Sequence, residues 1–210
     1  MHKFEALTAP SLHELIERGV TTAVVPFGSI EYQDPYLPIG ADALVADRVA
    51  AEVARRLGAL LLPTFRVGHA PSHARVPGTL TIAAATLADV AVESGQSLAQ
   101  NGVRVVALLS THGGNQAPLE VAANRLNGAS VGALACAPHG DLGPDPGTHS
   151  GEWLTSVLLA LAPELVRFGE ASEESARELR EASAERGAQH LERFVSSIVA
   201  HIRAVEGQVR

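Results

Sequence analysis

Short, almost continuously apolar runs alternate along the chain with longer segments whose apolar residues recur every three or four positions. Residues 21–27 and 103–109 are runs of the first kind, which are typical of strands buried on both faces of a sheet. Residues 42–57 are of the second kind, and Gly58 directly after them is typical of a helix end. Together these patterns predict strands at 21–27, 60–65, 103–109 and 131–137, and helices at 11–18, 42–57, 86–101, 118–126, 152–161 and 173–205.

The order of these elements predicts the fold class. Strands and helices alternate, and Ser11 and Thr86 are the expected N-terminal caps of two of the helices. Such an alternation favours a mostly parallel central sheet with helices on both faces, a three-layer α/β/α sandwich. No internal repeat, linker or low-complexity segment interrupts the pattern. We therefore expect a single domain over residues 1–210.

Four irregular segments, 28–41, 67–78, 110–116 and 138–150, each follow an expected strand. Because the ends of parallel strands meet at one edge of a sheet, where open α/β folds bind ligands, we expect a functional site there. Most of the unusual polar residues lie in or next to these segments: Glu31, Gln33, Asp34, Asp42, His69, His73, His112, Asn115, His139, Asp141, Asp145 and His149.

The composition excludes several classes of protein. Hydrophobic residues make up 46% and charged residues 19% of the 210 residues, which is typical of a globular chain. The net charge of −7 argues against a nucleic-acid partner, because such proteins carry basic surfaces. No window has the roughly 20 apolar residues that a membrane span needs, and the first residues lack the apolar run of a secretory signal. We expect a cytoplasmic protein with no nucleic-acid or membrane partner.

Cysteine chemistry has little place in this chain. The single cysteine, Cys136, excludes an intrachain disulfide and a cysteine-rich zinc site. It lies in an expected apolar strand and is interpreted as a buried structural thiol. His2, His13, His190 and His201 are interpreted as surface or helix-face residues. Metal chemistry in this protein would therefore use nitrogen and oxygen ligands from the loops.

Two carboxylates in the first loop are candidates for a cation site. Glu31 follows an expected strand, and Asp42 opens an expected helix. Carboxylate oxygens so placed bind divalent cations such as zinc. Residue types alone leave a second interpretation open, in which Asp42 is a helix cap and Glu31 is solvated.

Two histidines in later loops extend this picture. His112 ends a strand and is followed by Gly113 and Gly114, whose backbone N–H groups are candidates to stabilise an oxyanion. His149 precedes a helix start, where a neutral imidazole is favoured that can bind a metal or act as a base. Glu152 lies three positions further on. The alternatives are an ordinary tight turn at His112 and simple helix capping near Glu152.

Four motifs, in order and in register over roughly residues 20–165, resemble those of the creatininase family of metal-dependent amidohydrolases. The family's G-S-x-E-Q-H-G-P-H-L-P-x-x-T-D resembles GSIEYQDPYLPIGAD at 28–42, and its F-P-G-T resembles VPGT at 76–79. Its N-G-H-G-G-N resembles STHGGN at 110–115, and its H-A-G-x-x-E-T-S resembles HSGEWLTS at 149–156.

The resemblance implies an α/β sandwich, usually assembled as a homohexamer, with one or two ions of Zn, Mn or Fe. It implies that Glu31, Asp42 and His112 are metal ligands, with Asp42 as the bridging carboxylate in a two-metal site. It also implies that His149 takes part in proton transfer. Asn115 or the neighbouring glycine backbone would stabilise the oxyanion.

The chain departs from the family pattern at several of these positions. Gln33 replaces a histidine ligand, and its carbonyl oxygen is a weaker ligand than imidazole. Leu154 replaces the glutamate of E-T-S, and Gly114 stands where creatininase itself has a glutamate ligand. Asp34 and Glu152 are candidates to replace the lost histidine and carboxylate. The change at Gly114 argues against creatinine as the substrate but not against catalysis, and the departures together favour a single-metal site over a fully occupied two-metal site.

Two hypotheses from different classes follow. In the first, the protein hydrolyses a small cyclic or non-peptide amide with a metal-activated water, and its catalytic residues are His149, Glu152 and Asn115. Glu31, Asp42 and His112 hold the metal, assisted weakly by Gln33. In the second, it is a degenerate, non-catalytic family member that serves in binding or assembly. A metal-free acyl hydrolase using Ser29 or Ser110 has no suitably spaced base.

Overall fold

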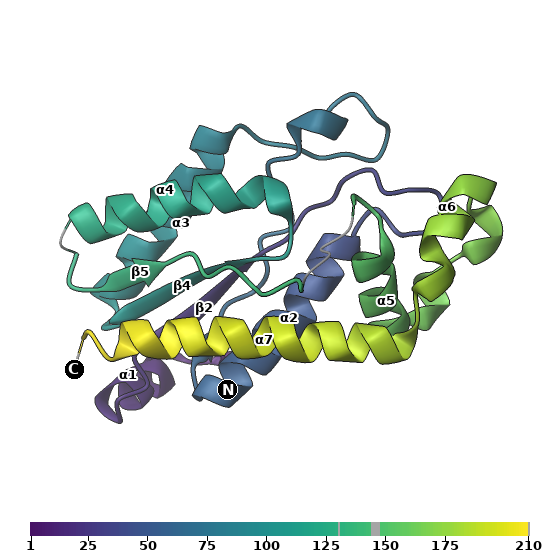
Figure 1. The fold of residues 1–210 in the computed structure, drawn as a ribbon. Helices are drawn as coiled ribbons and strands as arrows, with labels where there is room; N and C mark the ends of the chain where they lie inside the picture. The colour runs from purple at the N-terminus through teal and green to yellow at the C-terminus, as the bar shows by residue number, and fades with distance from the viewer. Residues whose placement is uncertain (130, 144–147, 210) are drawn as a thin grey trace.

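Five parallel strands, in the order β1-β3-β2-β4-β5, form the sheet at the centre of the molecule (Figure 1). The structure, a computed structural model, describes residues 1–129, 131–143 and 148–209. The predicted α/β architecture with a parallel sheet is confirmed; the single-domain boundary stays a prediction. The strands are β1 (His2–Lys3), β2 (Thr22–Phe27), β3 (Leu60–Leu61), β4 (Val105–Ser110) and β5 (Leu134–Cys136).

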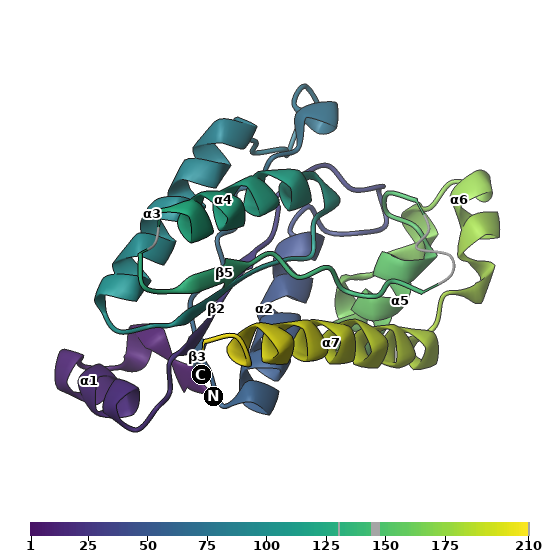
Figure 2. The ribbon, with the colours of Figure 1, turned by 60° about the vertical axis from the view of Figure 1, so that its left-hand side comes forward.

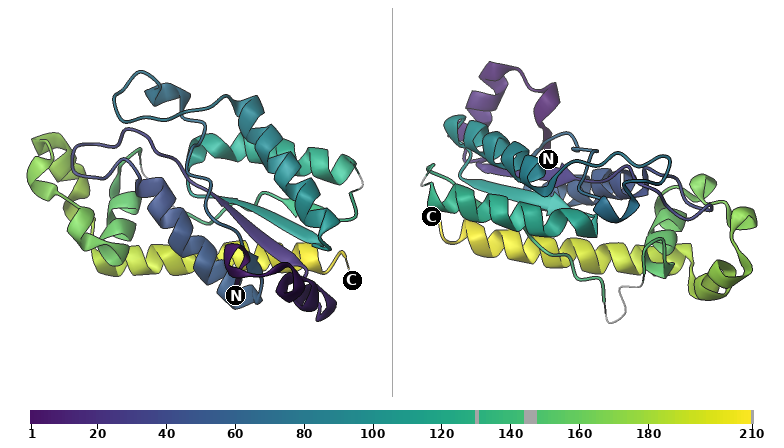
Figure 3. Two further views of the ribbon diagram at one scale, coloured as in Figure 1. Left: turned by 180° about the vertical axis from the view of Figure 1, so that it is seen from behind. Right: turned by 90° about the horizontal axis from the view of Figure 1, so that it is seen from above.

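Helices cover both faces of this sheet, and each face has its own apolar core. Along β4 the side chains alternate: Val105 and Leu109 pack in one core, and Val106 and Leu108 in the other. Figures 2 and 3 show α7 running along the face opposite α3 and α4. One layer holds α2 (Ala41–Leu57), α5 (Glu152–Leu161) and α7 (Ala184–Glu206), and the other holds α1 (Ala9–Glu17), α3 (Ala84–Gln100) and α4 (Gln116–Gly128). No helix among the described residues is long and apolar enough to span a bilayer.

The strand order places a switch point between β2 and β4. The chain passes from β2 through α2 to β3 on one side, and then returns through α3 to β4 on the other side of β2. At such a point the connecting loops diverge and leave a crevice beyond the strand ends, which is where open α/β sheets bind ligands. The loops after β2 and β4 carry Glu31 and His112.

Several predicted boundaries differ from the structure. The strand expected at 60–65 is regular only at Leu60–Leu61, because Pro63 has no N–H for the ladder. The helix expected over 173–205 is two helices, α6 (Glu173–Glu178) and α7, because the Ser183 hydroxyl accepts the Arg186 N–H and starts a new helix. The short strand β1 carries no periodic signal and was not expected.

The N-terminal caps expected for two helices are wrong, and the structure also shows where Cys136 and His190 lie. Thr8 rather than Ser11 caps α1, and α3 begins at Ala84, before Thr86. Cys136 is buried as expected, and burial raises the pKa of its thiol to about 12. His190 lies on a helix, α7, as one of the two expectations had it, but it is only 9% exposed, and its Nε2 lies 3.1 Å from Oε2 of Glu152.

The contact between α5 and α7 is close enough to predict a large effect of one methyl group. A Cβ at Gly187 would lie 1.9 Å from the Ser156 carbonyl oxygen. We expect Gly187→Ala to lower the free energy of unfolding by about 1–3 kcal/mol, the usual cost of overpacking. Urea titration measures this loss. Gly128→Ala, at the end of α4 with nothing within 4 Å, is the control and should be neutral or slightly stabilising. Equal effects of both substitutions would contradict the expectation.

Candidate metal centre

Three residues meet at the switch point: Glu31 from the loop after β2, Asp42 from the first turn of α2, and His112 from the loop after β4. The Nδ1 atom of His112 lies 3.2 Å from Oε1 of Glu31 and 3.3 Å from Oδ2 of Asp42. The Thr111 hydroxyl donates a 2.7 Å hydrogen bond to the Asp42 carbonyl, which ties the start of α2 to the end of β4. Glu31 and Asp42 are 2% and 5% exposed, so Glu31 is not solvated, and Gly40 rather than Asp42 is the N-cap of α2. The structure thus brings together the three residues expected from the sequence.

The spacing of these atoms matches a metal cage. Ligands about 2.0–2.1 Å from a tetrahedral zinc ion lie roughly 3.3 Å from one another. Oε2 of Glu31 and Oδ2 of Asp42 are buried and accept no hydrogen bond from the described residues. Two buried carboxylates with such oxygens are costly unless a cation balances them. The residues present therefore fit a divalent cation.

Electrostatics at this point favour a positive charge. Burial lowers the pKa of His112, but its close contacts with the carboxylates of Asp42 and Glu31 raise it to about 10. Burial also raises the pKa of Glu31, but the contacts with His112 outweigh it and lower that pKa below its usual range. The pKa of Asp42 is raised, chiefly by burial. The two acids thus hold a proton on His112, and a bound metal would supply that charge instead.

Backbone geometry fixes which nitrogen of His112 faces the carboxylates. Its Nε2 lies 3.0 Å from the His69 carbonyl oxygen. That oxygen only accepts, so Nε2 donates and Nδ1 faces the carboxylates, the usual second contact of a metal-bound histidine. A Cβ at Gly114 would lie 2.1 Å from the same oxygen and 2.5 Å from Nε2. Gly114 thus lets His112 reach its backbone partner.

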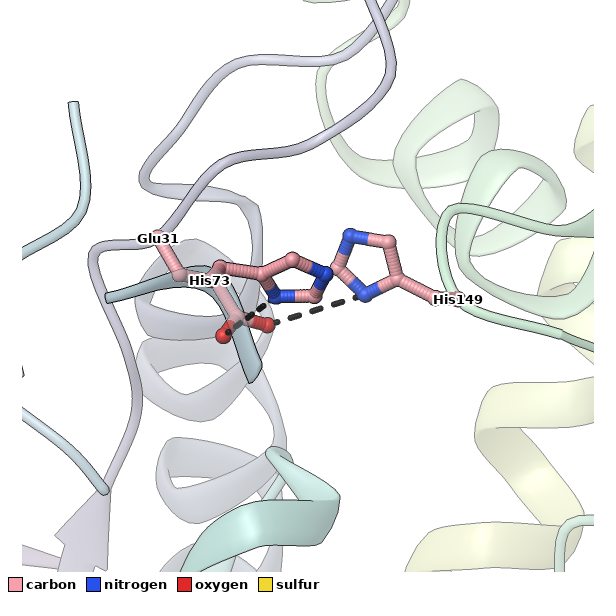
Figure 4. A group of neighbouring side chains, drawn as sticks. All are labelled: Glu31, His73 and His149. Carbon is pink, nitrogen blue, oxygen red and sulfur yellow. Dashed lines mark ion pairs between the residues drawn. The ribbon is translucent and has the colours of Figure 1, made fainter. Parts of the chain in front are cut away.

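Two further imidazoles, those of His73 and His149, also approach Glu31. Nδ1 of His149 lies 3.8 Å from Oε1 of Glu31, and Nδ1 of His73 lies 3.5 Å from Oε2 (Figure 4). His149 was expected here. The role of His73 was missed, although its loop was expected at this edge of the sheet.

A cavity of about 390 Å³ opens over these groups. Trp153, Leu142, Leu154 and Pro71 contribute apolar walls, and His69 lies among its polar lining. A concave site with apolar walls and a few convergent polar groups is typical of a small-ligand pocket.

Gln33 also lines this cavity, but its oxygen has a partner. Its Oε1 accepts a 2.7 Å hydrogen bond from the Ser150 hydroxyl, whose oxygen also accepts the Asp34 N–H. The Ser150 backbone has φ +56°, which is unusual for a residue with a side chain. A ligand role for Gln33 stays a prediction; in this structure Gln33 and Ser150 join the first loop to the fourth.

Asn115 and Asp34, two other residues expected at the site, make hydrogen bonds to other groups of the protein. Asn115 is fully buried; its oxygen accepts the His69 N–H at 2.8 Å, and its nitrogen donates to the Gly28 carbonyl at 2.9 Å. Asp34 accepts hydrogen bonds from the Tyr32 and Tyr36 hydroxyls, each at 3.3 Å. These contacts favour positioning roles for both side chains. Asp145 lies outside the described residues.

Glu152 points toward α7 rather than toward the candidate metal ligands. Its carboxylate accepts hydrogen bonds from the Ser156 hydroxyl at 2.6 Å and Arg186 Nε at 2.8 Å, and it lies 3.1 Å from His190 Nε2. A catalytic role for Glu152 stays untested, but these contacts favour a structural one.

This arrangement predicts a pH-dependent stability effect. Burial raises the pKa of Glu152, but the bonds from Arg186, Ser156 and His190 outweigh it and lower that pKa below its usual range. Because the pKa is lower in the folded state, the ionised carboxylate stabilises the fold at pH values above the pKa of the unfolded state. This contribution is lost as the pH falls through the pKa of the folded state. We expect Glu152→Gln to cost about 1–3 kcal/mol at neutral pH and less below about pH 4.

Denaturant titrations across this pH range measure the effect, with exposed Glu185→Gln in α7 as the control. Metal content should be unchanged in both variants. A loss of bound metal in Glu152→Gln would instead place Glu152 at the metal.

The fold and the site together define a class: an α/β protein with a candidate nitrogen–oxygen cation site at the switch point of a parallel sheet. A family model described as creatinine amidohydrolase matches residues 5–194. The chain therefore belongs to the creatininase family, and the resemblance seen in its motifs is confirmed.

Sequence relatives carry different names. A mycofactocin precursor peptide peptidase of Mycolicibacterium smegmatis is 33% identical over 165 residues, covering 75% of this chain and 63% of that protein. The creatinine amidohydrolase of Pseudomonas putida is 26% identical over 187 residues, covering 76% of this chain and 72% of that protein. The chain thus spans less than two thirds of the length of the mycofactocin peptidase that it matches.

Solved structures share the fold. A manganese form of creatininase aligns with a TM-score of 0.81 at 24% identity, covering 96% of this chain and 97% of that one. A mutant creatininase described as a Zn-Zn type aligns with a TM-score of 0.80 at 24% identity, covering 96% of each chain.

Proposed function

We propose that this protein hydrolyses an amide bond with one resident divalent cation, Zn²⁺ or Mn²⁺, held by Glu31, Asp42 and His112. The observation that carries the proposal is the pair of buried carboxylates at ligand spacing from His112 Nδ1, one of which, Asp42, presents an oxygen without a hydrogen-bond partner among the described residues. The names of structural relatives, which include zinc and manganese forms, support this choice of metals. Iron is the third candidate.

A bound cation lowers the pKa of water and polarises a carbonyl group. His149 moves the proton: its Nε2 donates to the Tyr32 carbonyl oxygen at 3.0 Å, which leaves the Nδ1 lone pair directed at the site. Nδ1 would take a proton from the attacking water and then give it to the leaving nitrogen. The backbone of Gly113 and Gly114 faces the same cavity and offers N–H donors to an oxyanion. Asn115 acts indirectly, because it fixes the loops that carry His69 and Gly28.

The substrate class that we propose is a peptide, which differs from the small cyclic or non-peptide amide expected from the sequence. A relative at 33% identity is named a peptide peptidase, whereas the relative named creatinine amidohydrolase is 26% identical. The family match keeps a small cyclic amide as the second candidate. A non-catalytic role is the third, and the loss of the family histidine at Gln33 is its motivation.

Metal analysis and a substrate panel test this proposal together. The protein is purified without chelator, and zinc, manganese and iron per chain are quantified before and after reconstitution. Short peptides and cyclic amides are then incubated with the loaded protein, and new amine and carboxylate products are detected by mass spectrometry. We expect about one ion per chain and cleavage of peptides. No bound metal, or metal without any hydrolysis across the panel, would favour the non-catalytic alternative.

The remaining expectations concern the whole protein. The proposal includes self-association as a homohexamer, a small-molecule or peptide partner, and a cytoplasmic location. Light scattering of the purified protein measures the assembly: six times the chain mass of 21.9 kDa is expected.

A further inference from the structure

Glu31 belongs to two groups of potential metal ligands, not one. In addition to the group with Asp42 and His112, Glu31 forms a second group with His73 and His149, whose ligand atoms all lie within 4.8 Å of one another. The two separations to Glu31, 3.5 Å and 3.8 Å, are slightly longer than the roughly 3.3 Å edge of a zinc cage. The two rings lie side by side, with centroids 4.3 Å apart, and Figure 4 shows both turned toward Glu31. Small side-chain rotations would close this group around an ion.

Two further observations point to a ligand in this second group. Nε2 of His149 lies 3.0 Å from the Tyr32 carbonyl oxygen, which only accepts, so Nε2 donates and Nδ1 faces Glu31. His112 in the first group makes the same kind of contact, because its Nε2 donates to the His69 carbonyl oxygen and its Nδ1 faces the carboxylates. In addition, Oε2 of Glu31, the oxygen nearest His73, is buried and has no hydrogen-bond partner among the described residues.

The two groups should differ in their affinity for a cation. The first contains two buried carboxylates and a largely buried imidazole. The second shares Glu31 with the first and adds His73 and His149, whose side chains are 25% and 35% exposed. Fewer negative charges and greater exposure make the second group the weaker one. It would fill only when metal is in excess.

We propose that Glu31, His73 and His149 form a second cation site whose occupation inhibits the enzyme. The proposal rests on the function assigned above, because the second ion would bind Nδ1 of His149, the atom that moves the proton. With that lone pair bound to metal, His149 neither takes nor delivers a proton. At saturation, turnover should fall by ~10²–10⁴, the usual contribution of a positioned acid or base. Two imidazoles bind Zn²⁺ more strongly than Mn²⁺, so excess zinc should inhibit and excess manganese should not.

The test measures binding and turnover separately. Metal-free protein is titrated with Zn²⁺ by calorimetry, and equilibrium dialysis gives the ions bound per chain. Wild type should show two binding phases, with inhibition following the second. His73→Gln should retain the first phase, which also shows that the variant is folded, and should lose both the second phase and the inhibition. His139→Gln is the matched control: this histidine is exposed, pairs with Glu120 on α4 and belongs to neither group. It should keep both phases.

Each result of these titrations supports or overturns one part of the proposal. A second phase that persists in His73→Gln, or no second phase in wild type, would overturn the proposed site. Two phases without inhibition would overturn the inhibitory role. A missing first phase with the second present would contradict the proposed catalytic metal site and leave the second site standing.

Discussion

Asp42→Asn should remove the resident cation from the protein. The substitution keeps the shape of the side chain but removes one of the two buried negative charges that balance the metal. Because Asp42 is proposed as a direct ligand, the loss of metal affinity should exceed the roughly 10–100-fold that loss of a supporting residue costs. Hydrolysis should fall to the rate without enzyme. Elemental analysis after dialysis and the peptide assay measure the two effects.

Two comparisons make this result specific. Asp47→Asn, on the same helix, removes a carboxylate that pairs with Thr64 and Arg66 at the surface, and it should leave metal content unchanged. The metal-free Asp42→Asn protein should be at least as stable as metal-free wild type, because an unsatisfied buried acid has gone. Wild-type metal content in Asp42→Asn would contradict the proposed ligand set.

His149→Ala should separate chemistry from metal binding. If His149 moves the proton, turnover should fall by ~10²–10⁴ while the first ion stays bound. The free energy of unfolding should change little, because the side chain is partly exposed and lies in a loop. Single-turnover assays and metal analysis of the same sample provide the measurements.

The contrary results are informative. Loss of the first ion in His149→Ala would make His149 a primary ligand, replacing the histidine missing at Gln33. Loss of stability without a separate effect on turnover would make it structural.

The alternation of strands and helices was enough to predict where Glu31, Asp42 and His112 meet. Each lies at or just beyond the carboxyl end of β2 or β4, or at the start of the helix after β2, so a parallel sheet brings them together whatever the details of the loops. The position of His73 could not be predicted in this way. It depends on a short 3₁₀ turn, Pro71–His73, and on a side-chain torsion that no periodic pattern encodes.

The expectation for Glu152 shows a different limit. Its place in the first turn of α5 was predicted correctly, but sequence spacing does not determine which neighbour that face of the helix meets. The carboxylate bonds to Arg186, 34 positions later, and lies beside His190, 38 positions later. Both belong to a helix whose start at Ser183 was itself missed. Interactions this distant are decided by how α5 and α7 pack.

The hydrogen bond between Ser150 and Gln33 joins residues 117 positions apart, and this has a consequence for the order of folding. Contacts between distant segments form slowly, because closing a long loop costs entropy before any contact repays it. The binding cavity should therefore be completed after the transition state, once α5 has docked. Zinc would then slow unfolding without accelerating refolding. Trp153, the sole tryptophan, is buried in the wall of that cavity, so its fluorescence reports both rates in the presence and absence of metal.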